Sequence, residues 1–572
     1  MPYAMRKLLV GVALVLLSLL IVDRIELAPS LLLTRRLSAQ DVPANVLIAL
    51  LLFGLAAWPR QPPICGRPTR IAASERRIGV ALTLLAALAA GLGTRYVALY
   101  TPISHDEIMT SFDAEIVRNG QMMAPIPPEW RSLSWALEPA FRLPVPGDAA
   151  WVSTYLPGNA VIRGLLAHLF GPAATNAVLV GIAMLGLWQA ARILWPSRHD
   201  AVVIAVLLGA TSAQVLCMGM TPYAMTAHLA LNLIWLCLYL RNSAWGHAGA
   251  LGVGFIATGL HQLIFHPLFV TPFIGQLLLD RRWRLAAIYV AGYTLICLFW
   301  ASYWQFLLNV HGVEGRAASA VGVSFLLLRI RHMLADFSWW GLQTMLRNLL
   351  RFVSWQNPLL LVLIVPGAVV AWRQGGVLRS LAAGLGLTVF AMFVLLPYQD
   401  IGWGYRYLHG LIGSASLLAA AGWVELTGQD AQPLRRTLRA MATVCTIATI
   451  VVLLPLRFSQ MHAYLAPYSR AWAAIERNPA EAVVIETISI DHGVELIRND
   501  PYLRNRPLMF DIGLLDEAQI AELCRRMTAV VFDGSQAAVY GITALDPTKH
   551  PAYGRLRHLR GLLEGPGCKR PT

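Results

Sequence analysis

The chain has 572 residues, of which 57% are hydrophobic and only 13% are charged, and its mean hydropathy is +0.57. Soluble domains carry about a quarter charged residues, so this composition excludes a soluble protein and indicates an integral membrane protein. The formal charge of +15 does not require nucleic acid as a partner, because arginines facing anionic membrane lipids account for it and no nucleic-acid-binding motif is present.

Apolar runs recur from Leu8 to Leu456. A helix needs about 20 residues to cross a bilayer, so we expect a polytopic α-helical membrane protein with about 13 spans. The expected spans cover residues 7–22, 44–58, 78–100, 174–194, 200–217, 222–240, 247–264, 266–279, 284–307, 357–372, 380–397, 408–427 and 440–456. The first run follows Arg6 and Lys7 without a small-residue cleavage site, which predicts an uncleaved anchor.

Basic residues in alternate loops predict the orientation. The loop after the second span is the most basic, and four other loops with Lys or Arg fall on the same side of the membrane under this span count. Because such loops are enriched in the cytoplasm, we expect the N-terminus there, and the C-terminal region outside, which is the periplasm if the cell has one. Three parts follow: an N-terminal two-span hairpin (1–77), a transmembrane core (78–456) and an outer domain (457–572).

A long outer loop, residues 101–156, follows the third span. It is rich in Pro and Trp, and its length predicts a functional segment lying on the membrane surface. The next segment, Pro157 to Phe170, is apolar but short and contains Arg163, so we interpret it as an interfacial or partly inserted helix. The arginine-containing stretch from Val321 to Val353 has the pattern of amphipathic surface helices.

The C-terminal region differs in character from the rest. Strand-sized apolar runs at 482–485, 507–510 and 529–532 alternate with helical patterns, which predicts a small α/β domain with a parallel sheet. It has no glycine-rich phosphate fingerprint, so we assign it no nucleotide. Cys524 and Cys568 can pair in an oxidising compartment, although Cys524 also fits the apolar face of a helix.

The most informative polar motif is the adjacent pair Asp106 and Glu107, directly after the third span. One such carboxylate can act as a general base at the membrane surface. The alternative interpretation is a solvated helix start, in which Ser104 or Asp106 caps a helix running to about Asn119 and the acids suit its dipole.

A second polar cluster contains Tyr405, Arg406 and Tyr407 on the same predicted face of the membrane. A guanidinium between two tyrosine rings can bind a phosphate through paired hydrogen bonds. An aromatic belt with an arginine reaching the lipid head groups explains the same residues. His261 and His266 are five residues apart, which places them on different faces of a helix, and no Glu follows in the spacing of a zinc protease, so they predict no metal site. One of them, and His228 near the outer end of a span, are further candidates for a polar cavity.

Together, these segments resemble the bacterial GT-C glycosyltransferases, a group that includes protein O-mannosyltransferases and the aminoarabinose and galacturonic acid transferases of lipopolysaccharide. The likeness rests on Asp106-Glu107, on residues 155–158 leading into 165–171, and on the Gly-aromatic-Arg-Tyr segment at 402–408. This chain has two extra spans before the acidic loop, and Thr154-Tyr155-Leu156-Pro157 stands where some members have Asp-His-Pro-Pro. The sugar is therefore not assigned by analogy.

The resemblance implies an inverting transferase that moves a sugar from a polyprenyl-phosphate carrier to an extracytoplasmic glycolipid, polysaccharide or protein. Asp106 is then the expected base, Glu107 orients the acceptor or a divalent metal ion, and Arg406 neutralises the departing phosphate. We expect Tyr405, Tyr407 and Tyr155, with His261 and His228, to contact substrate. No other cofactor is implied.

Two other classes remain open from the sequence. A lipid-linked sugar transporter or flippase fits the many spans, but paired broken spans with midplane charges are not evident. A polysaccharide polymerase or ligase would use similar polyprenyl-linked sugars. An enzyme consumes such a lipid in detergent, whereas a transporter does not.

Overall fold

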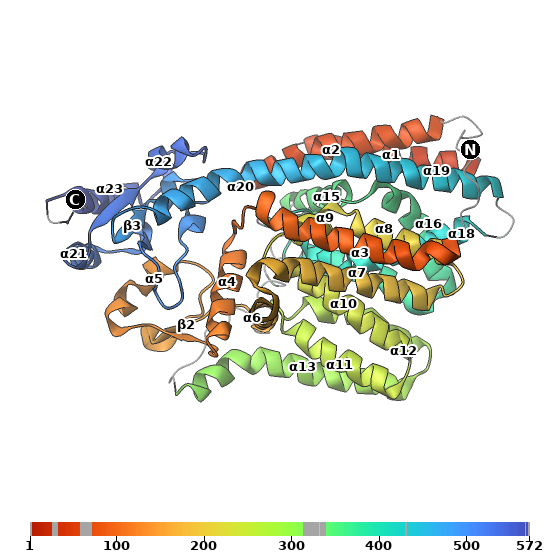
Figure 1. The fold of residues 1–572 in the computed structure, drawn as a ribbon, viewed down its shortest axis with the longest axis horizontal. Coiled ribbons are helices and arrows are strands. Elements are labelled where there is room, and N and C mark those ends of the chain that lie inside the picture. The colour runs from red at the N-terminus through yellow and green to blue at the C-terminus, as the bar shows by residue number, and fades with distance from the viewer. Residues whose placement is uncertain are drawn as a thin grey trace.

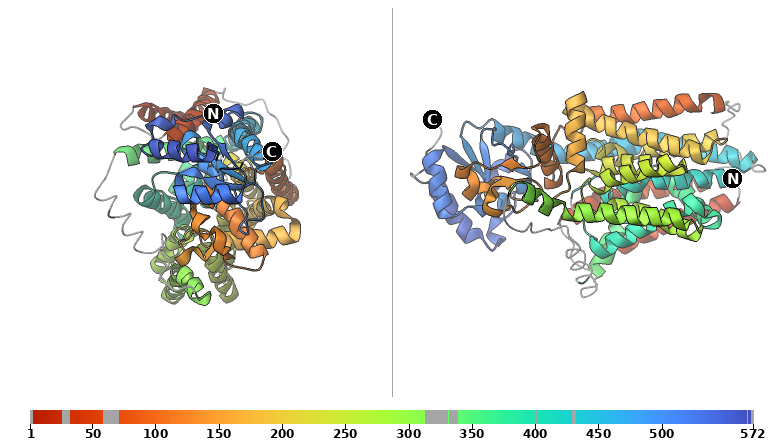
Figure 2. Two further views of the ribbon diagram at one scale, coloured as in Figure 1. Left: turned by 90° about the vertical axis from the view of Figure 1, so that its left-hand side faces the viewer. Right: turned by 90° about the horizontal axis from the view of Figure 1, so that it is seen from below.

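The computed structural model describes residues 3–25, 32–57, 71–312, 331, 339–399, 401–428, 432–566 and 568–569. The molecule is elongated, with a bundle of long helices at one end and a small α/β domain at the other (Figure 1). The N-terminus lies at the end of the bundle that is far from the α/β domain, and the C-terminus lies in that domain (Figure 2).

The helices and strands have the following bounds. The helices of the bundle are α1 (Tyr3–Arg24), α2 (Leu32–Ala57), α3 (Ile71–Tyr96), α6 (Gly158–Phe170), α7 (Thr175–Leu194), α8 (His199–Ala210), α9 (Ala213–Met218), α10 (Met225–Leu240), α11 (Ala244–Thr258), α12 (Phe265–Leu279), α13 (Trp283–Val310), α15 (Trp339–Ser354), α16 (Pro358–Gln374), α17 (Gly376–Leu395), α18 (Ile412–Leu426), α19 (Gln432–Ala448) and α20 (Leu454–Glu476). The outer part contains α4 (His105–Arg118), α5 (Ser134–Leu137), α21 (Glu517–Arg526), α22 (Gly534–Val539), α23 (Tyr553–Glu564), β1 (Ala124–Pro125), β2 (Ala150–Trp151), β3 (Ala482–Ile485), β4 (Leu508–Asp511) and β5 (Ala529–Phe532).

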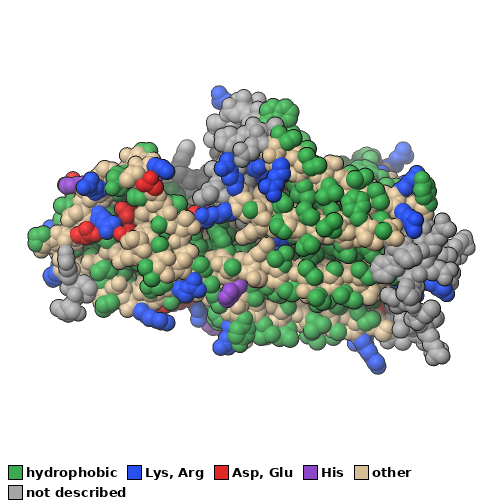
Figure 3. Space-filling model, turned by 90° about the horizontal axis from the view of Figure 1, so that it is seen from above, with side chains coloured by type: hydrophobic (Ala, Val, Ile, Leu, Met, Phe, Trp, Pro, Cys, Tyr) green, Lys and Arg blue, Asp and Glu red, His purple; other side chains and the backbone are tan. Residues whose placement is uncertain are grey.

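The expectation of a polytopic helical membrane protein is confirmed. In the described part of the chain, eight helices are long and apolar enough to cross a membrane, and the pair α15 and α16, bent by 112°, is a candidate for a ninth span. Predicted spans at 200–217, 222–240 and 266–279 coincide with the shorter apolar helices α8, α10 and α12. Hydrophobic side chains cover much of the bundle surface in Figure 3.

The predicted α/β domain is present, with a three-stranded parallel sheet in the order β4-β3-β5. β3 and β4 are fully buried, as the unbroken apolar runs predict, whereas the two middle residues of β5 are partly exposed. The last long helix does not stop at residue 457, because the helical segment Leu434–Glu476 continues without a gap from the bundle into this domain (Figure 1). Cys524 of α21 forms a disulfide bond with Cys568.

The outer loop and the α/β domain share one hydrophobic core. Met109 and Phe112 of α4 and Trp151 of β2 pack in the same cluster as Phe510 of β4. The indole of Trp151 donates a hydrogen bond of 2.8 Å to the carbonyl of Pro501. We expected this loop to lie on the membrane surface. In the structure it packs mainly against the α/β domain, because its apolar residues are buried against the sheet.

The arginines of α15 pair with acids of the N-terminal hairpin instead of reaching lipid head groups. Arg347 bonds to Asp23 of α1 at 2.6 Å, and Arg351 lies 3.8 Å from Asp41 of α2. α15 is thus packed against the hairpin and is not a free surface helix. Most of the stretch 321–338, including Arg329, lies outside the described residues.

Candidate active site

Helix α4 places the two acids at the junction between bundle and outer domain. It begins at His105 and ends at Arg118, close to the predicted end. Ser104 occupies the N-cap position, but its side chain makes no capping hydrogen bond and instead lies 2.6 Å from the hydroxyl of Tyr223. The acids are buried, so a solvated helix start does not describe them.

Asp106 and Arg406 meet although 300 positions separate them in the chain. One carboxylate oxygen of Asp106 accepts a hydrogen bond from the guanidinium of Arg406, and the other accepts the hydroxyl of Tyr155. Asp106 and Arg406 each keep only 7% of their surface exposed. The structure therefore brings together three of the residues that we predicted for the site.

Arg406 is held in place by its neighbours on two sides. Its guanidinium carbon lies 5.4 Å from the ring centre of Tyr223 and 5.3 Å from that of Tyr407, so two aromatic faces flank the cation. Gly404, two residues before Arg406, has a φ of +77°, and a Cβ there would lie 2.5 Å from the side chain of Gln214. Glycine is thus required for the turn that presents Arg406.

Tyr155 reaches Asp106 because its strand-like segment is fixed to the loop after α11. The amides of Leu156 and Gly158 donate to the carbonyls of His261 and Gly259 at 3.0 and 2.7 Å. This pairing stacks the rings of Tyr155 and His261 at a centroid distance of 4.0 Å. His261 therefore supports Tyr155, whose hydroxyl contacts the carboxylate.

Glu107 lies on a different face of α4 from Asp106. One of its oxygens accepts the amide of Ile103 at 3.0 Å, and the other has no hydrogen-bond partner among the described residues. Its side chain is fully buried. Adjacent helical residues point about 100° apart, so the two acids do not share one set of contacts.

The two acids differ in proton affinity. Burial favours protonation of Asp106, but Arg406, His261 and the Tyr155 hydroxyl outweigh it and lower the pKa of Asp106 below its usual 3.8. Burial raises the pKa of Glu107 from 4.5 to about 8, with Glu495 and Asp106 adding to the rise. At neutral pH, Asp106 is therefore ionised and Glu107 is mostly protonated.

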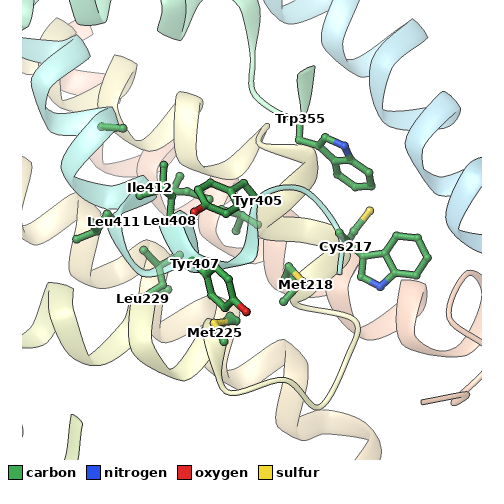
Figure 4. Packing of buried hydrophobic residues seen from close by; sticks show 14 of the residues in the cluster. Cys217, Met218, Met225, Leu229, Trp355, Tyr405, Tyr407, Leu408, Leu411 and Ile412 are labelled. Atoms are coloured by element: carbon green, nitrogen blue, oxygen red, sulfur yellow. The ribbon is translucent and has the colours of Figure 1, made fainter. Parts of the chain in front are cut away.

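Tyr405 and His228 lie away from this carboxylate. Tyr405 is fully buried and packs with Tyr407, Leu408 and Met218 among the hydrophobic side chains drawn in Figure 4. His228 is buried against Phe265, and its ring nitrogens have no hydrogen-bond partner in the described part of the chain. Neither residue makes a described contact with Asp106.

The arrangement does not fit a metal ion shared by Asp106 and Glu107. Both oxygens of Asp106 are engaged by Arg406 and Tyr155, and Glu107 faces elsewhere. Among the described residues, no three His, Cys, Asp or Glu side chains are grouped so that they could hold a metal ion. We therefore derive no step through a metal.

Three residues near the acids were missed by the sequence reasoning. His105 lies between Glu138 of the outer loop, at 3.1 Å, and Glu495 of the outer domain, at 2.8 Å. Burial alone would lower the pKa of His105, but these carboxylates raise it from 6.5 to about 10, so the ring is charged. In the sequence, only the position of His105 beside the acidic pair pointed to a role for it, because Glu138 and Glu495 are far from it along the chain.

No protein-family model and no curated protein matches the sequence. Among solved structures, the chain is similar to ArnT from Cupriavidus metallidurans in the apo state, with a TM-score of 0.46, 13% identity, and coverage of 77% of this chain and 86% of that one. The undecaprenyl phosphate complex of that ArnT gives a TM-score of 0.45.

The chain is also similar to the oligosaccharyltransferase of Archaeoglobus fulgidus tethered to an acceptor peptide. The TM-score is 0.41 with 13% identity, and the match covers 75% of this chain and 64% of that one.

Proposed function

We propose that the protein is a membrane glycosyltransferase of the GT-C kind, which transfers a sugar from a polyprenyl-phosphate donor to an extracytoplasmic acceptor with inversion. The observation that carries the proposal is the buried contact of Asp106 with Arg406 and Tyr155 at the outer end of the bundle. A base and a phosphate-binding cation are the two groups that such a transfer needs.

The Asp106–Arg406 pair gives a simple order of events. The donor phosphate competes with Asp106 for Arg406, since a guanidinium binds phosphate through paired hydrogen bonds. Once Arg406 turns to phosphate, Asp106 stays buried but loses its strongest counter-charge, and its pKa rises. Donor binding thus converts a paired carboxylate into a stronger base.

The chemical step is a single displacement. Asp106 removes the proton of an acceptor hydroxyl, the oxygen forms a bond to the anomeric carbon, and the bond from that carbon to the phosphate oxygen breaks. Polyprenyl phosphate leaves with the electron pair and its charge is stabilised by Arg406. Attack opposite the leaving phosphate inverts the configuration at that carbon.

Asp106 is a better candidate for the base than Glu107. A base must be ionised before it accepts a proton, and Asp106 meets this condition at neutral pH. Glu107 is mostly protonated there, because its pKa is raised to about 8. A protonated Glu107 can donate a hydrogen bond to an acceptor oxygen but cannot start the reaction.

The orientation and location belong to the same proposal. We place the α/β domain in the periplasm of a bacterial inner-membrane protein, as the basic loops indicate. The Cys524–Cys568 disulfide supports this placement, since disulfides persist in oxidising compartments.

The test uses purified protein in detergent with a labelled polyprenyl-phosphate sugar. We expect consumption of the donor in a membrane-free assay, and a loss of about 10²- to 10⁴-fold in turnover for Asp106→Asn, which keeps the side-chain shape. Asp148→Asn, in the same outer loop but paired with Arg142, is the matched control and should retain turnover. Full turnover by Asp106→Asn excludes Asp106 as the base. An intact donor in the detergent assay, together with its transport by the protein in sealed vesicles, supports a flippase.

A further inference from the structure

A large cavity lies on the side of α4 away from the Asp106–Arg406 contact. Its volume is about 540 Å³, and it is bounded by the end of α3, by α4, by α6 and by the start of α7. Ser111, Ala114 and Arg118 line it, and these residues share one face of α4 because they are three or four positions apart. Glu107 precedes Ser111 by one turn on that face.

The cavity contains a buried cation without a carboxylate partner. Arg163 of α6 is only 7% exposed and lines the cavity. Its terminal nitrogens donate to the side-chain oxygen of Asn176 at 2.9 Å and to the carbonyls of Thr221 and Tyr223 at 3.1 and 3.4 Å. Its Nε has no hydrogen-bond partner, and no carboxylate lies within 4.0 Å, among the described residues.

The buried guanidinium of Arg163 favours the binding of an anion in the cavity. Burying a guanidinium against neutral oxygens leaves most of its desolvation cost uncompensated, and an anion within the cavity would offset that cost. The one carboxylate that lines the cavity, Glu115, is already held by Arg118 at 2.8 Å and by Arg504 at 2.7 Å. The carboxyl whose charge acts on Arg163 is that of Glu107, and it is mostly protonated at neutral pH. Among the residues that the structure describes, the cavity is therefore electropositive.

The surroundings favour an anion on an apolar chain. Ala98, Ala167, Pro172 and Ala173 line the cavity beside Arg163. The outer face of α6 carries Leu165, Leu169 and Phe170, which are 59%, 73% and 58% exposed. Tyr100, another lining residue, is 55% exposed at the end of α3, a position typical of the head-group layer.

We propose that this cavity binds a phosphate carried on an apolar chain, with the phosphate at Arg163 and the chain passing along α6 into the bilayer. The binding stands independently of the reaction. The identity of this molecule as the acceptor rests on the proposed function, because the donor phosphate is placed at Arg406. The two arginines contact different parts of Tyr223, whose carbonyl accepts a hydrogen bond from Arg163 and whose ring flanks Arg406. The acceptor class is then a phosphate-bearing amphiphile.

The test measures binding to the purified full-length protein in a phosphate-free detergent. The probes are dioctanoyl phosphatidate, dioctanoylglycerol and inorganic phosphate. We expect phosphatidate to bind more tightly than either of the other two by about ten-fold or more, since it alone supplies both the charge and the chain. Equal affinity for dioctanoylglycerol or for inorganic phosphate overturns the proposal.

Variants locate the binding within the fold. Arg163→Gln should weaken phosphatidate binding by about ten-fold or more, as expected for losing hydrogen bonds to a charged group. Ala167→Trp fills the cavity while leaving the guanidinium in place, so it tests the site even if Arg163→Gln does not fold. Leu165→Trp is the matched control, because Leu165 lies on the same helix but does not line the cavity.

The outcomes are separate from those of the turnover assay. Loss of phosphatidate binding in Ala167→Trp and its retention in Leu165→Trp supports the site, whether or not Asp106→Asn is inactive. Unchanged binding in Ala167→Trp overturns the proposal and leaves the assignment of Asp106 untouched.

Discussion

His105 joins three parts of the protein, and its charge makes that junction sensitive to pH. It is the first residue of α4, Glu138 belongs to the outer loop and Glu495 to the α/β domain. All three side chains are buried. We predict that His105→Gln detaches the outer domain from the start of α4, because it leaves two buried carboxylates without their cation.

The magnitude follows from the proton affinity of the ring. The pKa of His105 is raised from 6.5 to about 10 in the folded protein. A tenfold change in proton affinity is worth about 1.36 kcal/mol, so the charged His105 contributes on the order of 5 kcal/mol to stability. Removing one partner from a buried ion pair costs about 3–5 kcal/mol, which is the same range.

The sign of the pH dependence is fixed by the raised pKa. The folded protein holds one more proton than the unfolded chain between pH 6.5 and about 10, so the contribution is complete below pH 6.5 and is lost as the pH rises through about 10. The difference in unfolding free energy between the wild type and His105→Gln should therefore shrink by about 1.4 kcal/mol for each pH unit in this window.

The assay is urea unfolding of the outer domain in detergent, at several pH values from 6.5 to 9.5. The titration of Glu107 occurs in both proteins and cancels in the difference. His558→Gln is the matched control, since His558 bonds to Glu517 at 3.1 Å on the exposed surface and should contribute about 0–1 kcal/mol. A difference between the wild type and His105→Gln that stays constant over this pH range refutes the reasoning.

Three other predictions concern the site and its support. Tyr155→Phe removes the hydroxyl bonded to Asp106 but keeps the aromatic stack, so turnover should fall about ten-fold with little change in melting temperature; equal turnover in steady-state assays would contradict a role for that hydrogen bond. Donor affinity should weaken as the pH rises through about 8, because Glu107 then becomes a second anion near Asp106. In binding assays, Glu107→Gln should make donor affinity less dependent on pH. The same pH dependence in Glu107→Gln as in the wild type would count against this role of Glu107. Cys524→Ser removes the disulfide bond to Cys568, 44 positions away, and should lower the free energy of unfolding in urea by about 4 kcal/mol while donor binding persists. A free energy of unfolding equal to that of the wild type would show that the disulfide does not stabilise the domain.

Most of the fold could be predicted because it depends on periodic burial. Uninterrupted apolar runs of span length became helices, and the apolar runs at 482–485 and 529–532 became strands of a parallel sheet. The extent of α20 could not be predicted in the same way. Residues 457–476 are too polar for a span, but a helix can leave the membrane and continue, since its backbone hydrogen bonds do not depend on lipid.

The site was only partly predictable, for a physical reason. Asp106 and Arg406 could be identified because each is a charge next to an apolar run, where an ionisable group is expensive. Glu495 gave no such signal, since it lies in a polar domain and acquires its role only when that domain packs on α4. Arg163 lies in a segment that the sequence predicts to be an interfacial or partly inserted helix, whereas its side chain is buried and lines a cavity.

The adjacency of Asp106 and Glu107 suggests a shared task, but helical geometry argues for a division of labour. Consecutive side chains diverge by about 100°, so a pair at the start of a buried helix faces two compartments. Asp106 faces the cation Arg406, which keeps it ionised, and Glu107 lies on the face that continues into the Arg163 cavity, where burial keeps it protonated. One helix thus carries an ionised group toward the proposed donor and a hydrogen-bond donor toward the proposed acceptor. Exchanging the two residues as Asp106→Glu with Glu107→Asp should abolish turnover although the composition of the pair is unchanged. Each environment fits a carboxyl on a side chain of one length, so the exchanged carboxyls would lose the contacts that set their proton affinities.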